Sequence, residues 1–186
     1  MQTHLIGLAG QAGSGKNTAA LALEAEGWTQ RAFADPVREM LYRLDPVLAD
    51  PEGEAGTTTL SWEVDRHGWN YVKRQFPEVR GYLQCLGTEA GRGVLGENVW
   101  IDTMFRGAET WGPTVITDVR FPNEAEAIRE HGGVVVRIER PSVAPIREAN
   151  HASETALRSW PFDAVLVNDG TVEDLQGRLA ALTQPS

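Results

Sequence analysis

The sequence has one cysteine, Cys85, in 186 residues. A lone cysteine excludes a disulfide within the chain and a metal site built from several cysteines. Because its neighbours are apolar and helix-forming, we expect Cys85 to be a buried, unreactive thiol. A zinc site is not expected either, since no second histidine stands at metal-ligand spacing from His151.

The chain also lacks long apolar runs, a signal-peptide pattern and an excess of positive charge. No run is long enough to span a membrane, and the formal net charge is −9. Nucleic-acid polymers are bound through basic surface. We therefore expect a cytoplasmic protein with neither a membrane nor a nucleic-acid polymer as partner, although a local arginine cluster can still bind a small phosphorylated molecule.

The hydrophobic pattern predicts short strands that alternate with helices. The strands are expected at residues 4–9, 29–34, 114–118, 134–138 and 164–167. The helices are expected at residues 16–25, 35–43, 78–92, 98–106, 122–131 and 172–182. This alternation predicts an α/β fold with a central parallel sheet covered on both faces, at a length that fits one domain. At about 44–72 the pattern weakens, and we expect a mobile loop or a small substrate-covering excursion.

The most informative stretch is GQAGSGKNT, residues 10–18, directly behind the apolar run at 5–9. A phosphate group needs several backbone N–H donors aimed at one spot, and a glycine-rich turn bends tightly enough to supply them. The following residues are strong helix formers, so the positive N-terminal end of a helix adds to this anion site. The spacing is that of the Walker A pattern. The residues expected to hold the phosphates are Gly13, Ser14, Gly15, Lys16, Asn17 and Thr18.

The pattern has one departure, because Asn17 stands where a Ser or Thr usually ligates Mg²⁺. An amide oxygen can face the ion directly or through a water, but less reliably than a hydroxyl. A glycine-rich turn that binds nothing is the alternative. The required order of strand, loop, lysine and helix favours the phosphate site.

A second residue that holds Mg²⁺, directly or through a water, is expected at the end of a later strand. Asp118 ends the strand at 114–118, and the carboxyl ends of parallel strands face the ligand crevice. With a phosphate loop, this is the Walker B arrangement, in which a carboxylate holds Mg²⁺ directly or through water. Capping of the helix that starts near Pro122 is the alternative role.

Several arginines are candidates for binding an acceptor phosphate and neutralising a transferred one. The candidates are Arg31, Arg38, Arg74, Arg80, Arg92, Arg120, Arg137 and Arg140. About half of such arginines are expected to be merely solvated or ion-paired. Those beside glycine or at strand ends, namely Arg92, Arg120 and Arg140, are the favoured ones.

Four further residues have two interpretations each. Asp35 can cap a helix whose first residue is Pro36, or it can face an acceptor sugar or a metal-bound water. Trp69 can stack a base, as can Trp62 and Tyr71, although scattered aromatic residues are more often core. Asn168 and Gly170 fit a turn by composition, but their place after the last strand would also let them touch a purine.

Together these motifs resemble the deoxynucleoside monophosphate kinases of tailed bacteriophages, a branch of the P-loop nucleoside monophosphate kinase-like fold. The matching stretches are GQAGSGKNT at 10–18, FADPVREM at 33–40, EVRGYLQCLGTEAGR at 78–92, VW at 99–100, VITDVRFPNEAEAIREHGG at 115–133, HASET at 151–155 and VNDGTVEDL at 167–175. They follow the family's order over most of the chain, and the family shares the departure at position 17. The stretch at 44–72 has no clear counterpart.

The resemblance implies a three-layer α/β/α kinase domain over 1–186, with a lid-like segment at about 140–155. It implies Mg²⁺-dependent transfer of the γ-phosphoryl group of ATP to deoxynucleoside monophosphates for dNTP supply, in the host cytoplasm if a phage encodes the protein, and it suggests a homodimer. By motif, the catalytic residues are Lys16, Arg92, Arg120 and Arg140. The acceptor-binding residues are Asp35, Arg80, Arg92 and Arg120, with Trp69 as a base-stacking candidate. Asn17 and Asp118 would attend Mg²⁺, and Asn168 and Gly170 would approach adenine.

Two alternatives remain open from the sequence. One is a P-loop kinase for another small acceptor, such as dephospho-coenzyme A or phosphomevalonate. This alternative stays open because the acceptor site includes residues 44–72, where the sequence pattern is weakest. The other is a nucleotide-dependent switch that hydrolyses ATP or GTP slowly. A guanine-specific GTPase would usually carry Asn-Lys-x-Asp after a late strand, and the sequence has no such stretch.

Overall fold

The computed structural model describes residues 4–49, 56–142 and 156–183. These residues form two compact units, one of Met1–Phe33 with Phe105–Ser186 and one of Ala34–Met104. We call the first the sheet unit and the second the helical unit. The single kinase domain predicted over 1–186 stays a prediction, and the excursion predicted at 44–72 lies within the helical unit.

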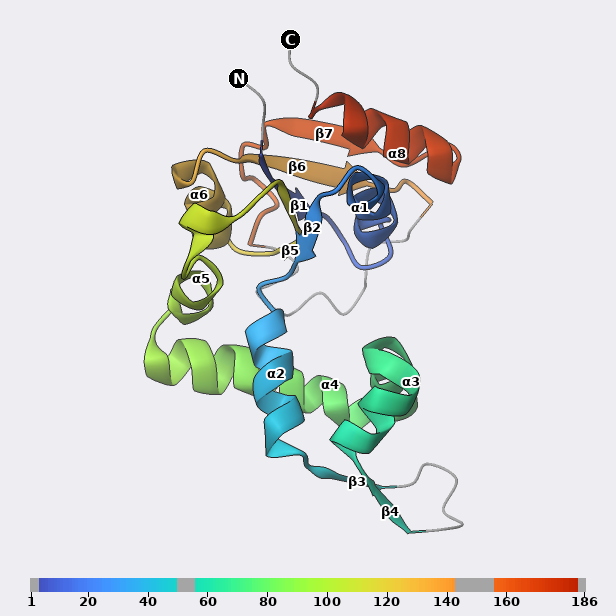
Figure 1. The fold of residues 1–186 in the computed structure, drawn as a ribbon, viewed down its shortest axis with the longest axis vertical. Helices are drawn as coiled ribbons and strands as arrows, with labels where there is room; N and C mark the ends of the chain where they lie inside the picture. Colours follow the sequence, from blue (N-terminus) through green and yellow to red (C-terminus); the bar gives the residue numbers. More distant parts are fainter. Residues whose placement is uncertain (1–3, 50–55, 143–155, 184–186) are drawn as a thin grey trace. The chain divides into compact units, whose positions relative to one another are not determined.

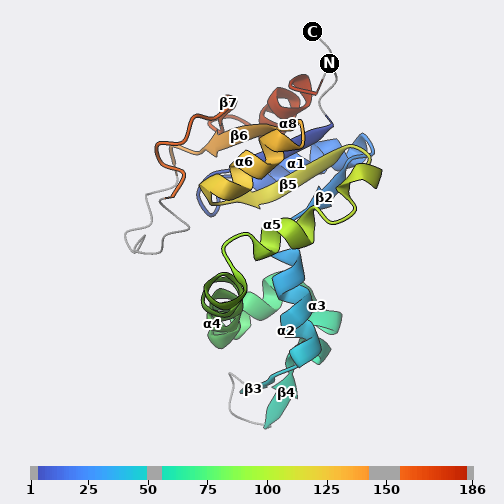
Figure 2. The same ribbon diagram turned by 90° about the vertical axis from the view of Figure 1, so that its left-hand side faces the viewer.

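The sheet unit is built on a parallel sheet of five described strands in the order β2-β5-β1-β6-β7. The strands are β1 (Leu5–Ala9), β2 (Thr29–Arg31), β5 (Thr114–Val119), β6 (Val134–Glu139) and β7 (Ala164–Val167). The helices are α1 (Lys16–Ala25), α6 (Pro122–Glu130) and α8 (Val172–Ala181). Figures 1 and 2 show α1 and α8 on one face of the sheet and α6 on the other. The predicted α/β fold with a parallel sheet between helix layers is therefore confirmed.

The position of β1 follows from its apolar sequence. All five of its residues are buried, as expected for a strand covered on both faces. Ile6 pairs with Val115 of β5 on one side and with Val134 of β6 on the other. This central place puts the residues after Ala9 at the carboxyl edge of the sheet, where open α/β sheets bind ligands.

The helical unit has its own apolar core. Its elements are α2 (Asp35–Leu44), β3 (Val47–Ala49), β4 (Thr57–Thr59), α3 (Leu60–Gln75), α4 (Pro77–Gln84), a π-helical segment (Cys85–Leu95) and α5 (Val99–Met104). The strands β3 and β4 form an antiparallel pair. The core consists of Leu41, Leu48, Leu60, Val72, Phe76 and Val79. None of the described helices in either unit has the length and apolar character needed to cross a membrane.

Most predicted elements of the sheet unit agree with the structure within a few residues, whereas parts of the helical unit differ from the predictions. The mobile-loop interpretation of residues 44–72 is wrong, and the substrate-covering excursion predicted there stays a prediction. Residues 44–72 contain a hairpin and most of the long helix α3, which bends at Gly68 (φ 77°, ψ 162°). The helix expected at 78–92 is α4 followed by a π-helical segment, and Cys85 is exposed rather than buried.

Asp35 is also placed differently from the sequence prediction. The N-cap of α2 is Ala34, so the Asp35 carboxylate does not cap the helix. Instead, Asp35 Oδ1 accepts a hydrogen bond from Arg38 Nη1 at 2.7 Å. Pro36 has no backbone N–H, so the first turn of α2 has one donor fewer that needs a hydrogen-bond acceptor.

Candidate active site

The loop between β1 and α1 has the backbone geometry of a phosphate site. Gly10, Gly13 and Gly15 have φ angles of 139°, 79° and 103°, which other residues rarely adopt. A Cβ atom on Gly10 would collide with the carbonyl oxygen of Ile138, and one on Gly15 would lie 2.6 Å from Asn168 Nδ2. A Cβ atom on Gly13 would meet no atom within 4 Å. The loop therefore packs closely at both ends and leaves open space at its middle glycine.

The helix that follows contributes its N-terminal dipole to the same place. α1 begins at Lys16, and its N-cap residue is Gly15, which has no side chain to cap the helix. Backbone N–H groups at an uncapped helix start are donors that an anion can use. The Lys16 ammonium donates to the carbonyl oxygens of Gly10 at 2.6 Å and Gln11 at 2.8 Å. Positive charge is thus held within the curve of the loop.

Ser14 provides a test of whether a phosphate fits this loop. The residue is 1% exposed, and among the described residues its Oγ atom has no hydrogen-bond partner. A buried hydroxyl without a partner costs free energy, and such groups in native structures usually mark an ion, a water or a ligand. A phosphate oxygen at the loop would accept from this hydroxyl, so the residues present fit the donor phosphates.

The two expected Mg²⁺ residues come from neighbouring elements of the sheet unit. Asp118 lies one residue before the end of β5, and its Oδ1 atom accepts a hydrogen bond from the Phe33 amide at 2.7 Å. Asn17 is exposed in the first turn of α1. Mg²⁺ in phosphate sites keeps several waters and needs only one or two protein ligands. This pair fits such a role, whereas the described residues contain no cluster of three acidic, histidine or cysteine side chains.

The alternative role proposed for Asp118, capping of the next helix, is wrong. The N-cap of α6 is Phe121, and the amides there are held by Glu124. Glu124 is 3% exposed, and its Oε2 atom accepts from the Arg120 amide at 2.7 Å and the Phe121 amide at 3.1 Å. This buried carboxylate fixes the backbone from which the Arg120 side chain projects.

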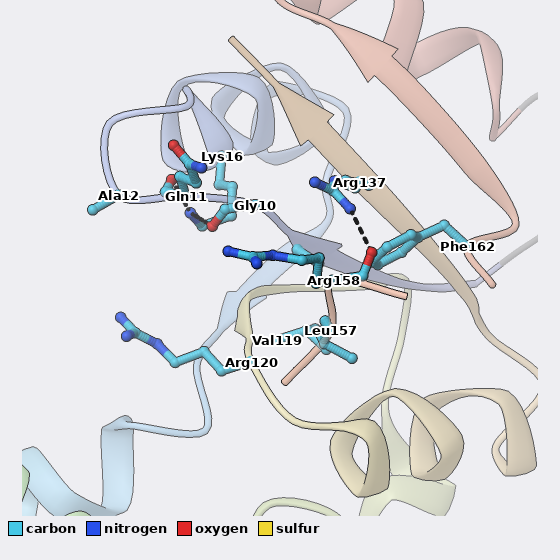
Figure 3. Close-up of a pocket in the computed structure, with 11 residues that line it drawn as sticks. Gly10, Gln11, Ala12, Lys16, Val119, Arg120, Arg137, Leu157, Arg158 and Phe162 are labelled. Atoms are coloured by element: carbon cyan, nitrogen blue, oxygen red, sulfur yellow. Dashed lines mark hydrogen bonds between the residues drawn. The ribbon is translucent and has the colours of Figure 1, made fainter. Parts of the chain in front are cut away.

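A pocket of about 100 Å³ opens beside the loop at the carboxyl edge of the sheet. Its charged lining residues are Lys16, Arg120, Arg137 and Arg158, and among the described residues no Asp or Glu lines it. Figure 3 shows the Arg158 side chain pointing toward the loop. Arg137 pairs with Glu139 at 2.8 Å, and its Nη1 atom contacts the carbonyl oxygen of Arg158 at 3.5 Å. Four cationic side chains around one small space form a site for a polyanion.

Sequence reasoning missed Arg158 in this set. Arg137 is a candidate from the sequence, but the favoured arginines are those beside glycine or at strand ends. Arg158 stands in an irregular turn without a motif, and no local signal relates it to residue 16. Only the sheet topology brings these residues to one edge.

Comparison with known proteins agrees with this geometry. A family model described as deoxynucleotide monophosphate kinase matches residues 70–179, more than half of the chain. The chain belongs to the deoxynucleotide monophosphate kinase family. The predicted family membership is thereby confirmed.

Individual relatives cover the chain to different extents. The chain is 33% identical over 192 residues to the Acanthamoeba polyphaga mimivirus protein named "Putative deoxynucleotide monophosphate kinase", covering 94% of this chain and 93% of that protein. It is 33% identical over 100 residues to the deoxynucleoside-5'-monophosphate kinase of Escherichia phage T5, covering 50% of this chain and 40% of that protein. Among solved structures, a shikimate kinase from Aquifex aeolicus aligns with a TM-score of 0.47 at 12% identity, covering 96% of this chain and 95% of that chain.

In this member of the family, Asn168, one of the two residues predicted to approach adenine, lies next to the loop. Asn168 Nδ2 donates to the carbonyl oxygen of Ser14 at 2.8 Å. Gly170 lies close to the first turn of α8, where a Cβ atom would come within 2.6 Å of Asp174 Oδ2. Asn168 therefore has a structural role at the loop, and its predicted contact with adenine stays a prediction.

The remaining predicted acceptor residues of this kinase belong to the helical unit. Arg80 Nε donates to the Lys73 carbonyl oxygen at 2.9 Å, and Arg92 Nη1 donates to the Glu97 carbonyl oxygen at 3.0 Å. Trp69 is half-buried against the core of this unit. The roles of these residues and of Asp35 in acceptor binding stay predictions.

Arg140 is exposed directly after β6. Most of the lid-like segment predicted at about 140–155, including His151, lies outside the described residues.

Proposed function

We propose that this kinase transfers the γ-phosphoryl group of ATP to the 5′-phosphate of a deoxynucleoside monophosphate and so supplies diphosphates for dNTP synthesis. The observation that carries the proposal is the pocket of four cationic side chains beside the N-terminus of α1. The donor and acceptor phosphates of this reaction place many negative oxygens in one small space. A pocket lined by Lys16, Arg120, Arg137 and Arg158 matches that charge distribution.

Each group in the pocket has a definite part in the proposed reaction. The acceptor phosphate is already anionic at pH 7, so the reaction needs positioning and charge neutralisation rather than a covalent intermediate. The loop amides, Ser14 Oγ and Lys16 Nζ bind the donor phosphates. Arg120 and Arg158 donate to the acceptor and to the transferred group, where planar guanidinium groups match phosphate oxygens in pairs.

Mg²⁺ is the proposed cofactor, held through Asn17 and Asp118. When bound there, it would supply positive charge that stabilises the charge developing on the donor phosphates. Arg140 is proposed as a further phosphate contact, and Arg80, Arg92, Asp35 and Trp69 as acceptor contacts from the helical unit. A cytoplasmic location, where ATP and nucleotides are abundant, and a homodimer belong to the proposal.

The test is ADP formation from ATP and Mg²⁺ with each common NMP and dNMP in turn. The Lys16→Ala protein serves as the blank, because loss of a charge that stabilises a transferred phosphoryl group costs about a hundredfold or more in turnover. ADP production that depends on one or more deoxynucleotides supports the proposal. If no nucleotide raises ADP formation above the blank, the acceptor is a different metabolite or the protein is a nucleotide switch, and the proposal is wrong.

A further inference from the structure

Arg158 reaches the cationic pocket of the sheet unit from irregular chain. Residues 156–163, which we call the Arg158 segment, form a turn followed by extended chain that leads into β7. Arg158 is exposed, and its side chain points toward the phosphate loop (Figure 3). A guanidinium group on such a segment helps a reaction only if its backbone is held in the productive position. The contacts that hold the Arg158 segment therefore bear on catalysis.

The end of the Arg158 segment is held at Asp163. The Asp163 amide donates to the carbonyl oxygen of Val135 in β6 at 3.0 Å, and Asp163 Oδ2 accepts from the Val135 amide at 2.7 Å. The same carboxylate accepts two hydrogen bonds from Arg129 in the last turn of α6, from Nε to Oδ2 at 3.2 Å and from Nη2 to Oδ1 at 2.8 Å. This pairing in a fork fixes the orientation of the guanidinium group as well as its distance.

Arg129 also contacts the middle of the Arg158 segment. Its Nη2 atom donates to the Pro161 carbonyl oxygen at 2.5 Å, and its Cζ atom lies 4.1 Å from the centroid of the Trp160 ring. The Trp160 amide donates to the Leu157 carbonyl oxygen at 3.2 Å, which closes the turn that contains Arg158. One planar group of α6 thus holds both the end of the segment and the residue that closes the turn.

These contacts supply geometry more than stability. The side chains of Arg129 and Asp163 are 37% and 34% exposed, and an ion pair so close to solvent stabilises a fold only slightly. A network of hydrogen bonds in a fork, a backbone contact and a stacked ring nevertheless allows one arrangement of the segment and disfavours others. Its consequence is expected in the position of Arg158 rather than in the melting temperature.

The same helix holds the backbone of a second arginine of the pocket. Glu124, in the first turn of α6, accepts from the Arg120 amide at 2.7 Å. α6 therefore contacts both backbone segments from which Arg120 and Arg158 project. We infer that Arg129 and Asp163 are positioning residues for Arg158, and that α6 in this way sets the spacing of the two guanidinium groups that donate to the acceptor and to the transferred group.

This inference rests on the proposed function, since Arg158 acts in that reaction. Its test is Arg129→Ala in two backgrounds. In otherwise wild-type protein, kcat with a deoxynucleotide should fall about tenfold, because a small displacement of a positioned group is costly, while the KM for ATP should change less than twofold. In Arg158→Ala protein, the same change should lower kcat less than twofold, because no guanidinium group is left to position. Asp163→Asn should show the same dependence on Arg158.

Thermal melting separates positioning from stability. Arg129→Ala should lower the melting temperature by the same amount in both backgrounds, because its contacts are to Asp163, Pro161 and Trp160. Arg129→Lys keeps a positive charge beside Asp163 but loses the planar fork, so its kcat should lie between those of wild type and Arg129→Ala. Glu130→Ala, at an exposed position of the same helix, is the matched control and should behave as wild type. If Arg129→Ala lowers kcat by the same factor in both backgrounds, or lowers only the melting temperature, the inference is wrong.

Calorimetric binding of inorganic tripolyphosphate distinguishes failure of the inference from failure of the proposed function, because it probes the cationic pocket without turnover. Arg129→Ala should weaken this binding in otherwise wild-type protein but not in Arg158→Ala protein. If no deoxynucleotide raises ADP formation and this dependence is still found, the proposed function is wrong and the positioning role stands. If deoxynucleotides are turned over but Arg158→Ala changes neither kcat nor the affinity for tripolyphosphate, the inference alone is wrong.

Discussion

Asn168 donates a hydrogen bond from Nδ2 to the carbonyl oxygen of Ser14 at 2.8 Å and so connects the segment after β7 to the phosphate loop. The backbone N–H of Asn168 donates a second hydrogen bond, to the carbonyl oxygen of Glu139 at 2.7 Å. Because a Cβ atom on Gly15 would lie 2.6 Å from the same Nδ2 atom, the loop can approach Asn168 only with glycine at that position. The ends of β6 and β7 thus hold the loop in its phosphate-binding curve.

Replacing Asn168 by Ala removes this connection. We expect the KM for ATP to rise on the order of tenfold, since loss of one such hydrogen bond costs about 1 kcal/mol and loosens the loop as well. The KM for the acceptor should change less. Steady-state kinetics with each substrate varied separately checks this. Asp169→Ala is the control, because Asp169 pairs with Arg178 at the surface; equal effects of both variants would contradict the role given to Asn168.

The parts of the fold that sequence predicts best are those specified by local chemistry. The strand and helix around the phosphate loop follow from an apolar run, three glycines and a run of helix formers. Pro122 and the pair Gly132–Gly133 mark the ends of α6 in the same way. Each of these signals acts within about ten residues, so no tertiary information is needed to read it.

The parts that sequence misses depend on tertiary contacts. The π-helical segment accompanies the packing of Trp100, whose Nε1 atom donates to the Gly87 carbonyl oxygen at 2.6 Å and whose ring leaves no room for a Cβ atom on Gly91. β4 is three threonines, which have no apolar alternation, and α3 contains Gly68. Arg158 lies before β7, in a turn with no motif, and only the tertiary fold places it beside Lys16 in the pocket.

Arg120 is the residue through which acceptor use is best tested. Arg120→Lys keeps the charge but replaces a planar group of five donors by a point charge. We expect the KM for the deoxynucleotide to rise on the order of tenfold to a hundredfold, with less than a threefold change in the KM for ATP. Kinetics at saturating concentrations of the other substrate measure each value.

Arg106→Lys provides the matched control, because Arg106 is an exposed residue of the same unit. It should behave as wild type. If Arg120→Lys damages ATP use and acceptor use equally, Arg120 serves the donor site or the fold instead of the acceptor.

Glu124 is expected to matter for both stability and turnover. Glu124→Ala leaves the partly buried amides of Arg120 and Phe121 without their carboxylate, at a cost of about 1–3 kcal/mol. The melting temperature should fall by roughly 2–10 °C for a protein of this size. Turnover should fall as well, because the backbone that carries Arg120 is no longer fixed.

Glu126→Ala is the control for this prediction, since Glu126 lies on the same helix but is exposed. Thermal melting should show little change for this variant. If both variants lower the melting temperature equally, the destabilisation comes from loss of a negative charge on α6 and not from loss of the Glu124 hydrogen bonds.

Asp45 connects the end of α2 to the start of α3. It has a φ angle of 45°, and its Oδ1 atom accepts a hydrogen bond from the Ser61 amide at 2.7 Å. This backbone hydrogen bond lowers the pKa of the Asp45 carboxyl below its ordinary value of 3.8, and the Ser61 and Thr59 hydroxyls lower it further. The folded state therefore favours the charged carboxylate.

Asp45→Asn tests this connection, because asparagine tolerates the same left-handed backbone and removes only the charge. A lowered folded-state pKa stabilises the protein above the ordinary value, and this contribution is lost as the pH falls through the lowered pKa. Wild type should therefore exceed Asp45→Asn in free energy of unfolding at pH 7, and the difference should shrink below about pH 4. Urea unfolding at several pH values measures this difference. Asp102→Asn, at an exposed position, is the control, and its free energy of unfolding at pH 7 should differ less from that of wild type. If the difference in free energy of unfolding between wild type and Asp45→Asn stays constant down to pH 2, the charge of Asp45 does not stabilise the helical unit.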